Sequence, residues 1–188
     1  NVMYRLRVVG EENIPRTGGA ILVCNHVSFI DWIIVGAGIR RPVRFVMDHA
    51  FFKGSFIIRQ LAIMGKVIPI ASSKEDPELL KAAFERTAEE LKRGAIVCIF
   101  PEGMLTSDGT LNRFKPGVEK MLKETPVPVI PMALINLWGS FFSRKGGRAI
   151  LKVPRRFWSR ITLQIGEAVP PGQATAPYLQ EKVAKLLE

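Results

Sequence analysis

One histidine in this chain has a carboxylate at a spacing that could support catalysis. His26 follows the apolar segment 20–24, and Asp31 comes five residues later. If the chain turns after His26 and begins a helix near Ser28, Asp31 falls in the first helical turn and can reach back to the imidazole. A carboxylate bonded to one ring nitrogen fixes the tautomer and makes the other nitrogen more basic. Such a pair could deprotonate an attacking hydroxyl, and general-base assistance is worth roughly 10²–10⁴-fold in rate.

A structural role explains the same residues equally well. Ser28 and Asp31 have the spacing of a capping box that opens a helix, which would leave His26 as a bystander. Asp31 could also serve both purposes, because a helix cap and an imidazole partner can use different carboxylate oxygens. The other histidine, His49, has no comparable setting and is predicted to be structural. These residues alone leave catalysis and capping open.

A second group of polar residues follows another apolar run. In Phe100-Pro-Glu-Gly103, proline ends the strand, and the glycine lets backbone groups approach a ligand without a side chain between them. Glu102 would lie on the same side of a sheet as His26 if the two strands are parallel. In the long loop that follows, Arg113 and Lys115 could meet a phosphate. The alternative is that Pro-Glu-Gly is an ordinary turn with no role in binding.

Short apolar runs alternate with helical patterns along the whole chain. Strands are predicted at 20–24, 44–47, 67–70, 95–100, 127–133 and 161–165, and helices at 31–38, 52–63, 77–93, 117–124 and 177–187. Continuous apolar runs are typical of strands that are covered on both faces. We therefore predict an α/β fold: one domain over 1–188, built as a sandwich in which helices flank a mostly parallel or mixed sheet.

Composition narrows the class of partner. The chain has 188 residues, of which 47% are hydrophobic, and 27 Lys and Arg against 17 Asp and Glu give a net charge of +10. This excess predicts a polyanionic partner. The two cysteines favour a reducing compartment. No apolar stretch reaches the roughly 18–20 residues that span a bilayer. Because residue 1 is Asn, we expect a piece of a longer membrane-associated or multidomain protein.

Most of the excess positive charge is concentrated late in the chain. The stretch 125–166 contains no acidic residue, and its basic residues alternate with aromatic ones. This composition suits an anionic membrane surface, where each cation contributes about 1 kcal/mol. A solvated basic face is the alternative. No helix-turn-helix, RNP or zinc signature favours nucleic acid. The residues that we expect to contact the membrane are Trp138, Arg155, Arg156, Phe157 and Trp158.

Together, the polar groups resemble the phospholipid/glycerol acyltransferase family. The segment from Asn25 to Asp31 matches its first block, the His-x₄-Asp motif; Phe100-Pro-Glu-Gly103 matches the third, and Val129-Ile-Pro131 the fourth. The resemblance spans residues 5–166 and looks closest to bacterial 2-acylglycerophosphoethanolamine acyltransferases.

This resemblance implies the glycerolipid acyltransferase fold and a role for each motif residue. His26 would be the general base and Asp31 its orienting partner. Asn25, Ser28, Glu102 and Gly103 would bind the acceptor or the developing oxyanion. A lysophospholipid hydroxyl would attack the thioester of acyl-CoA or acyl carrier protein directly, without an acyl-enzyme. The enzyme would work at the cytoplasmic face of a membrane. No metal or other cofactor is expected, because two separated histidines with no clustered cysteines do not make a usual metal site.

Two blocks depart from the family pattern. In the family, the second block usually ends in an Asp-Arg or Asn-Arg pair, where this chain has Ala71-Ser72, and the third commonly carries an arginine where this chain has Met104. Both missing arginines would grip a phosphate monoester. Their absence favours a lysophospholipid whose phosphate is a diester, with lysophosphatidic acid as the alternative acceptor. Four cations could substitute for them: Lys66, Lys74, Arg113 and Lys115. A non-catalytic module that binds lipid or acyl carrier protein also stays open.

Overall fold

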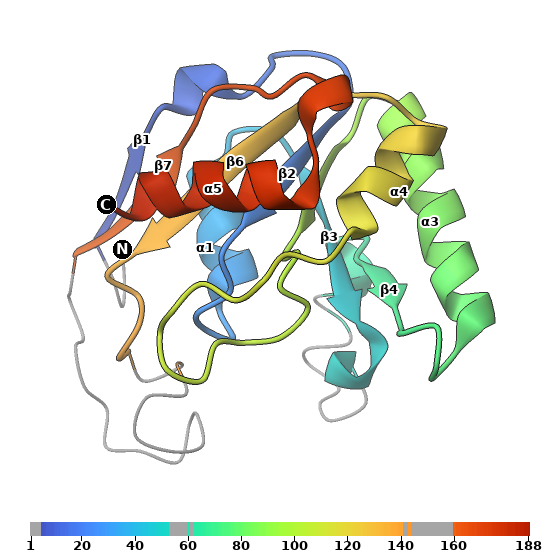
Figure 1. The fold of residues 1–188 in the computed structure, drawn as a ribbon, viewed down its shortest axis with the longest axis horizontal. Coiled ribbons are helices and arrows are strands. Elements are labelled where there is room, and N and C mark those ends of the chain that lie inside the picture. Colours follow the sequence, from blue (N-terminus) through green and yellow to red (C-terminus); the bar gives the residue numbers. More distant parts are fainter. Residues whose placement is uncertain (1–4, 53–59, 61, 141–142, 144–159) are drawn as a thin grey trace.

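A seven-stranded sheet forms the centre of the computed structural model, which describes residues 5–52, 60, 62–140, 143 and 160–188 (Figure 1). The strand order is β1-β7-β6-β2-β5-β3-β4. All neighbours are parallel except β6 and β7, so the sheet is mixed, as predicted. The strands are β1 (Arg5–Val9), β2 (Ala20–Cys24), β3 (Val43–Asp48), β4 (Ile68–Ile70), β5 (Ile96–Ile99), β6 (Val129–Ile135) and β7 (Arg160–Ile165).

Helices cover both faces of this sheet. On one face lies α1, and on the opposite face lie α3, α4 and α5 (Figure 1). The α-helices are α1 (Asp31–Gly38), α3 (Pro77–Lys92), α4 (Gly117–Glu124) and α5 (Ala176–Leu187), and the short 3₁₀ helices are η1 (Glu11–Asn13), η2 (His49–Phe52) and η3 (Pro171–Gln173). This arrangement confirms the predicted α/β sandwich.

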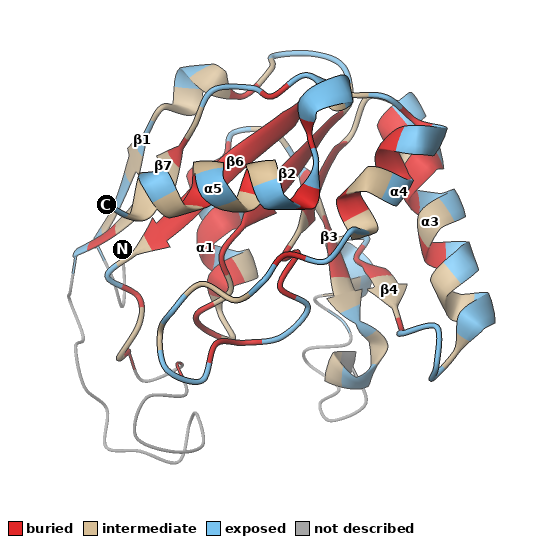
Figure 2. Ribbon diagram, viewed as in Figure 1, coloured by how far each residue is buried: buried red, intermediate tan, exposed pale blue. Residues whose placement is uncertain are grey.

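Strand β2 shows why its sequence is apolar throughout. All five of its residues are buried (Figure 2). Ala20, Leu22 and Cys24 face the core under α1, whereas Ile21 and Val23 face the core under α3, α4 and α5. The alternation of side chains along a strand thus supplies both cores from one apolar run.

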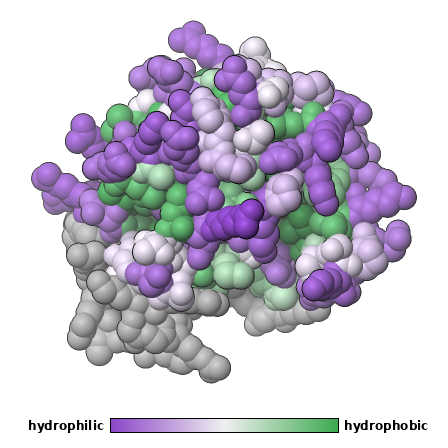
Figure 3. Space-filling view, in the orientation of Figure 1, coloured by the Kyte–Doolittle hydropathy of each residue, from purple (hydrophilic) through white to green (hydrophobic). Residues whose placement is uncertain are grey.

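The predicted helices form where capping and periodicity place them. Asp76 caps α3 by accepting a hydrogen bond from the Leu79 N–H at 2.9 Å, and Pro77 occupies the first helical position. Helices α1 and α4 have the predicted bounds. Most of the helix predicted at 52–63 lies outside the described residues. Hydrophilic side chains cover much of the face that carries α3 and α5, with apolar patches between them (Figure 3).

The register of β2 against β5 positions the two polar segments. The strands run parallel and pair from Ala20 with Ile96 to Val23 with Ile99, so the segments that follow them leave the sheet at the same edge. The long loop between β5 and α4 then runs past this edge (Figure 1). Within the described part of the chain, no helix is long and apolar enough to cross a membrane.

Candidate active site

His26 and Asp31 form a hydrogen-bonded pair at the carboxyl edge of the sheet. The imidazole Nδ1 lies 2.8 Å from Asp31 Oδ2, and the side chains are 24% and 0% exposed, respectively. The chain turns after His26, and α1 begins at Asp31, which brings the carboxylate back to the ring. The predicted pairing is therefore present, with a buried acid and a base that solvent can reach.

The side-chain hydrogen bonds of Asp31 to the described residues all use one carboxylate oxygen. Besides the imidazole, Oδ2 accepts the N–H groups of Val27 at 2.7 Å and Ser28 at 2.9 Å. Asp31 Oδ1 is buried and has no hydrogen-bond partner among the described residues. The expectation that the cap and the imidazole would use different oxygens is thus wrong, because the turn after β2 directs both backbone N–H groups at Oδ2.

Only half of the expected capping box forms. The Asp31 carboxylate reaches the Ser28 N–H, but Ile30 occupies the N-cap position of α1, and no side chain in the described part of the protein makes a capping hydrogen bond there. The Ser28 hydroxyl instead accepts the Ile30 N–H at 3.4 Å, and the serine is completely buried. His26 is therefore not a bystander to a cap, and Ser28 is shielded from any substrate in this conformation.

The carboxylate of Asp31 determines which ring nitrogen of His26 carries the proton. Burial raises the pKa of Asp31, while the hydrogen bonds from His26, Ser28 and Val27 act in the opposite direction. An ionised carboxylate can only accept hydrogen bonds, so it selects the tautomer with the proton on His26 Nδ1. Nε2 then carries the lone pair. The Phe100 ring stacks on the imidazole with centroids 4.4 Å apart, which fixes its plane.

Glu102 also lies beside His26, but it contacts the main chain. Its Oε1 accepts the His26 N–H at 2.6 Å, and its Oε2 accepts both the backbone and side-chain N–H groups of Asn112 at 2.8 Å. The residue is 2% exposed. Burial raises the pKa of Glu102, and the hydrogen bonds from Asn112 and His26 oppose that rise. Both oxygens are thus occupied by protein donors rather than facing an acceptor.

Gly103 closes a tight turn that brings a cation to this region. Its N–H donates to the Phe100 carbonyl at 3.0 Å, and its φ of +67° lies in the left-handed region that favours glycine. A Cβ there would lie 2.5 Å from Lys115 Nζ. The structure thus brings Lys115 against the third block, where it is exposed. Arg113 is exposed on the same loop.

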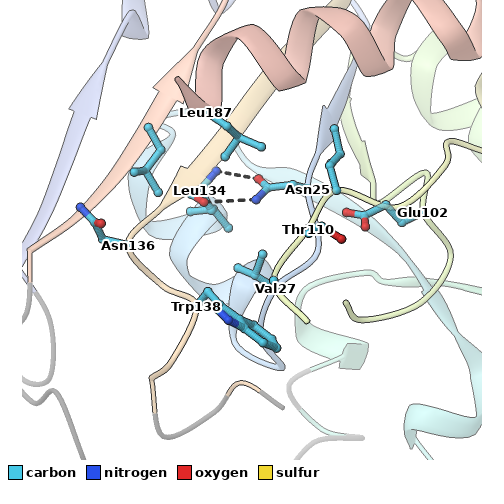
Figure 4. A pocket seen from close by; sticks show the side chains of 11 residues that line it. Asn25, Val27, Glu102, Thr110, Leu134, Asn136, Trp138 and Leu187 are labelled. Carbon is cyan, nitrogen blue, oxygen red and sulfur yellow. Dashed lines mark hydrogen bonds between the residues drawn. The ribbon is translucent and has the colours of Figure 1, made fainter. Parts of the chain in front are cut away.

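Asn25 pairs with the backbone of β6 and lines a small pocket. Its amide accepts the Leu134 N–H at 2.7 Å and donates to the Leu134 carbonyl at 3.2 Å (Figure 4). The pocket, about 150 Å³, lies where β2 and β6 end, and its lining includes Glu102, Trp138 and Leu187. Asn25 is thus engaged with the protein on one side and with the pocket on the other.

The remaining predicted site residues lie apart from His26 or outside the described residues. Lys66 is exposed just before β4, which is three strands from β2, or about 14 Å at the usual strand spacing. Trp138 lines the pocket and is half-buried. A Cβ on Gly109 would lie 2.5 Å from its ring nitrogen, so the indole packs against the loop. Arg155, Arg156, Phe157 and Trp158 lie outside the described residues.

Two loop residues near His26 form contacts that the sequence does not predict. Asn112 holds Glu102, and the Thr106 N–H donates to the His26 carbonyl at 3.0 Å. Neither residue belongs to a periodic pattern, and a loop sequence does not disclose which backbone groups it will meet. Within the described residues, no three His, Cys, Asp or Glu side chains gather closely enough to hold a metal ion.

Comparisons with known proteins agree on a family. The model of a family described as Acyltransferase matches residues 5–135. The chloroplastic 1-acyl-sn-glycerol-3-phosphate acyltransferase of Arabidopsis thaliana is 33% identical over 134 residues, which is 71% of this chain and 36% of the relative. The 1-acyl-sn-glycerol-3-phosphate acyltransferase of Borreliella burgdorferi is 26% identical over 132 residues, which is 70% of this chain and 52% of the relative.

A solved structure extends the likeness to nearly the whole chain. The crystal structure of the 1-acyl-sn-glycerophosphate acyltransferase from Thermotoga maritima superposes with a TM-score of 0.70 and 25% sequence identity, covering 97% of this chain and 69% of that one. By contrast, the matched part of this chain spans only about a third to a half of the curated relatives' own length.

Proposed function

The chain belongs to the Acyltransferase family, and we propose that it transfers a fatty acyl group from an acyl thioester to the free hydroxyl of a 1-acyl-sn-glycerol 3-phosphate. The observation that carries the proposal is the 2.8 Å hydrogen bond between His26 Nδ1 and the buried Asp31 carboxylate. It leaves Nε2 as the basic nitrogen of a side chain that is 24% exposed. The names of the relatives support the acceptor.

The proposed reaction moves one proton through His26. Nε2 removes the proton of the acceptor hydroxyl as its oxygen attacks the thioester carbonyl carbon, and Asp31 stabilises the imidazolium that forms. The tetrahedral intermediate collapses, the C–S bond breaks, and the imidazolium returns the proton to the departing thiolate. A C–O bond has replaced a C–S bond, and the base has returned to its starting state without an acyl-enzyme.

The residues of the second and third blocks and the names of the relatives favour different acceptors. The absent arginines at Ser72 and Met104 favoured a phosphodiester acceptor, whereas the relatives act, by name, on a phosphate monoester. We give precedence to the monoester because Lys115 Nζ lies over Gly103 and supplies a cation to the third block. A diester lysophospholipid stays the second candidate on one observation: the arginine position holds Met104, which is 58% exposed.

The experiment that tests the function follows consumption of the thioester by the purified protein. Acyl-CoA and acyl-loaded acyl carrier protein serve as donors, and lysophosphatidic acid and lysophosphatidylethanolamine serve as acceptors. We expect turnover with lysophosphatidic acid that disappears in His26→Ala. Faster turnover with lysophosphatidylethanolamine would select the second candidate. A folded protein that transfers to neither acceptor would support a non-catalytic lipid- or carrier-binding module.

We also propose that the protein acts at the cytoplasmic face of an anionic membrane. Its net charge of +10 and the acid-free stretch 125–166 support this location. Co-sedimentation with vesicles of phosphatidylglycerol and phosphatidylcholine should weaken when Arg155 and Arg156 are replaced by Glu, and the loss should be largest at low salt. Lys81→Glu with Lys92→Glu on the exposed face of α3 is the charge-matched control. Equal sedimentation of both variants would remove these arginines from the membrane contact.

A further inference from the structure

A single loop holds the His26 main chain from both sides. The Glu102 carboxylate accepts its N–H at 2.6 Å, and the Thr106 N–H donates to its carbonyl at 3.0 Å. The Phe100 ring stacks on its imidazole. Three residues within seven positions thus constrain the base, in addition to its bond with Asp31. The residues of β2 before His26 are held by their pairing with β5, and the loop that follows β5 holds His26 itself.

Glu102 is itself held by Asn112. The backbone and side-chain N–H groups of Asn112 both donate to Glu102 Oε2 at 2.8 Å, while Oε1 serves His26. With three N–H donors and 2% exposure, the carboxylate is a bridge between two parts of the chain. An ionised group in such a place is costly without donors. The two N–H groups of Asn112 therefore stabilise the buried Glu102 carboxylate next to the proposed base.

The far end of the loop is anchored independently of this bridge. The Lys115 N–H donates to the Pro101 carbonyl at 2.9 Å, and the Phe114 N–H donates to Gln180 Oε1 on α5 at 2.9 Å. Asn112 thus lies between Thr106, whose N–H donates to the His26 carbonyl, and these two anchors. Pre-organisation of this kind matters because small displacements of a catalytic group cost large factors in rate.

We propose that Asn112 is a positioning residue for the proposed general base: it fixes Glu102, which in turn fixes the main chain of His26 and so the direction of its imidazole. The inference rests on the proposed acyl transfer. It also gives Glu102 a different role from the acceptor contact that the family resemblance implies. Its oxygens are occupied and buried, and its negative charge would repel a phosphate.

A charge cycle tests the bridge. Asn112→Asp places a second carboxylate against Glu102 Oε2, so we expect kcat to fall about tenfold or more while KM for lysophosphatidic acid changes less than about twofold. In the Glu102→Gln background, the Gln amide can donate to the new Asp, and the same substitution should cost less than about threefold. Ser107→Asp, which adds equal charge to an exposed position of the same loop, should stay within about twofold of wild type.

Amide hydrogen exchange supplies a readout that needs no activity. By NMR, the His26 N–H should be protected in the wild type and should exchange about tenfold faster in Asn112→Asp, but not in Ser107→Asp. If Asn112→Asp does not fold, Asn112→Ala removes one donor without repulsion and should show the same changes at smaller size.

The outcomes separate this inference from the proposed function. An unchanged kcat together with unchanged His26 exchange in Asn112→Asp would overturn the inference while leaving the acyl transfer intact. So would a loss confined to the acceptor KM, because it would make Glu102 an acceptor ligand. If the wild type shows no turnover with any donor and acceptor, the proposed function fails, and the exchange measurement alone then decides whether Asn112 positions His26.

Discussion

Two regions of the sheet, which follow β2 and β3, each place a histidine beside carboxylates, and they differ in how the acid is held. After β2, His26 Nδ1 lies 2.8 Å from an Asp31 side chain that is fully buried. After β3, His49 lies 3.6 Å from Asp48 and 3.6 Å from Glu75, whose side chains are 66% and 52% exposed. The contact between His26 and Asp31 is a hydrogen bond, whereas the two contacts of His49 are too long to be hydrogen bonds.

The difference arises from the backbone rather than from the residue types. Two N–H groups fix the Asp31 oxygen that meets the imidazole, and Glu102 and Thr106 fix the main chain of His26. Exposed carboxylates such as Asp48 and Glu75 are screened by water and contribute little. A histidine near an acid is thus a catalytic candidate only when the surrounding main chain orients both groups.

The largest effect that separates the two regions is expected from removing each imidazole. His26→Ala should lower acyl transfer up to about 10⁴-fold, because it removes the proposed general base, which would take the hydroxyl proton. His49→Ala should keep activity within about threefold, since its carboxylate contacts are too long for hydrogen bonds. Circular dichroism shows whether both variants are folded. Equal losses of thioester turnover in two folded variants would end the distinction.

A smaller loss is expected from neutralising each acid. Asp31→Asn keeps an oxygen that can accept the Val27 and Ser28 N–H groups, but it removes the charge that stabilises an imidazolium. We expect kcat to fall about 10²-fold. Asp48→Asn, at an exposed position, should stay within about twofold of wild type. Single-turnover measurements with one donor would compare the two variants, and a fully active Asp31→Asn enzyme would contradict the proposed mechanism.

Asp31→Asn, which should lower activity, should raise the stability of the folded protein near neutral pH. Burial raises the pKa of Asp31, so the folded state binds the proton more readily than the unfolded chain does. The contribution of this group to stability is therefore largest below its unfolded pKa of about 3.9 and is lost as pH rises through the raised folded pKa. Melting temperatures of Asp31→Asn should thus gain on wild type from pH 4 to pH 7. A constant difference would show that the charge is not costly.

The sequence predicts the elements better than it predicts the contacts at their ends. Helices α1 and α4 have the bounds that periodicity and punctuation predict, because those signals are local. The reach of Asp31 to His26 is also local, across five residues. Asn25, by contrast, bonds Leu134, which is 109 residues away, and only the pairing of β2 with β6 brings the two together.

The loop after β5 shows why the rest could not be predicted. Phe100-Pro-Glu-Gly103 is visible as a motif, but the partner of Glu102 is a main-chain N–H, which every residue except proline possesses. Asn112 looks like any polar loop residue until the fold directs both of its donors at one carboxylate oxygen. The sequence predicts a membrane contact for Trp138, but it does not disclose that the ring also packs against Gly109.

The smallest effect is expected from adding the same cation beside each region. Met104 directly follows the glycine over which Lys115 lies, and it is 58% exposed. Met104→Arg therefore adds a guanidinium where a phosphate would approach Lys115, and we expect KM for lysophosphatidic acid to fall about threefold to tenfold at low salt. Because the third block touches the main chain of His26 through Glu102 and not through Met104, kcat should change little.

Met64→Arg is the matched control for this prediction. Met64 is 77% exposed and precedes β4, in the half of the sheet that carries His49. Met64→Arg adds the same charge to the protein as Met104→Arg does. Any general attraction of the anionic acceptor to a more basic surface should therefore appear in both variants. A fall in KM that is specific to Met104→Arg, and larger for lysophosphatidic acid than for lysophosphatidylethanolamine, would place the acceptor phosphate beside His26. Equal falls in both variants would show that the added charge acts from a distance, and the phosphate would then have to be sought elsewhere along the carboxyl edge.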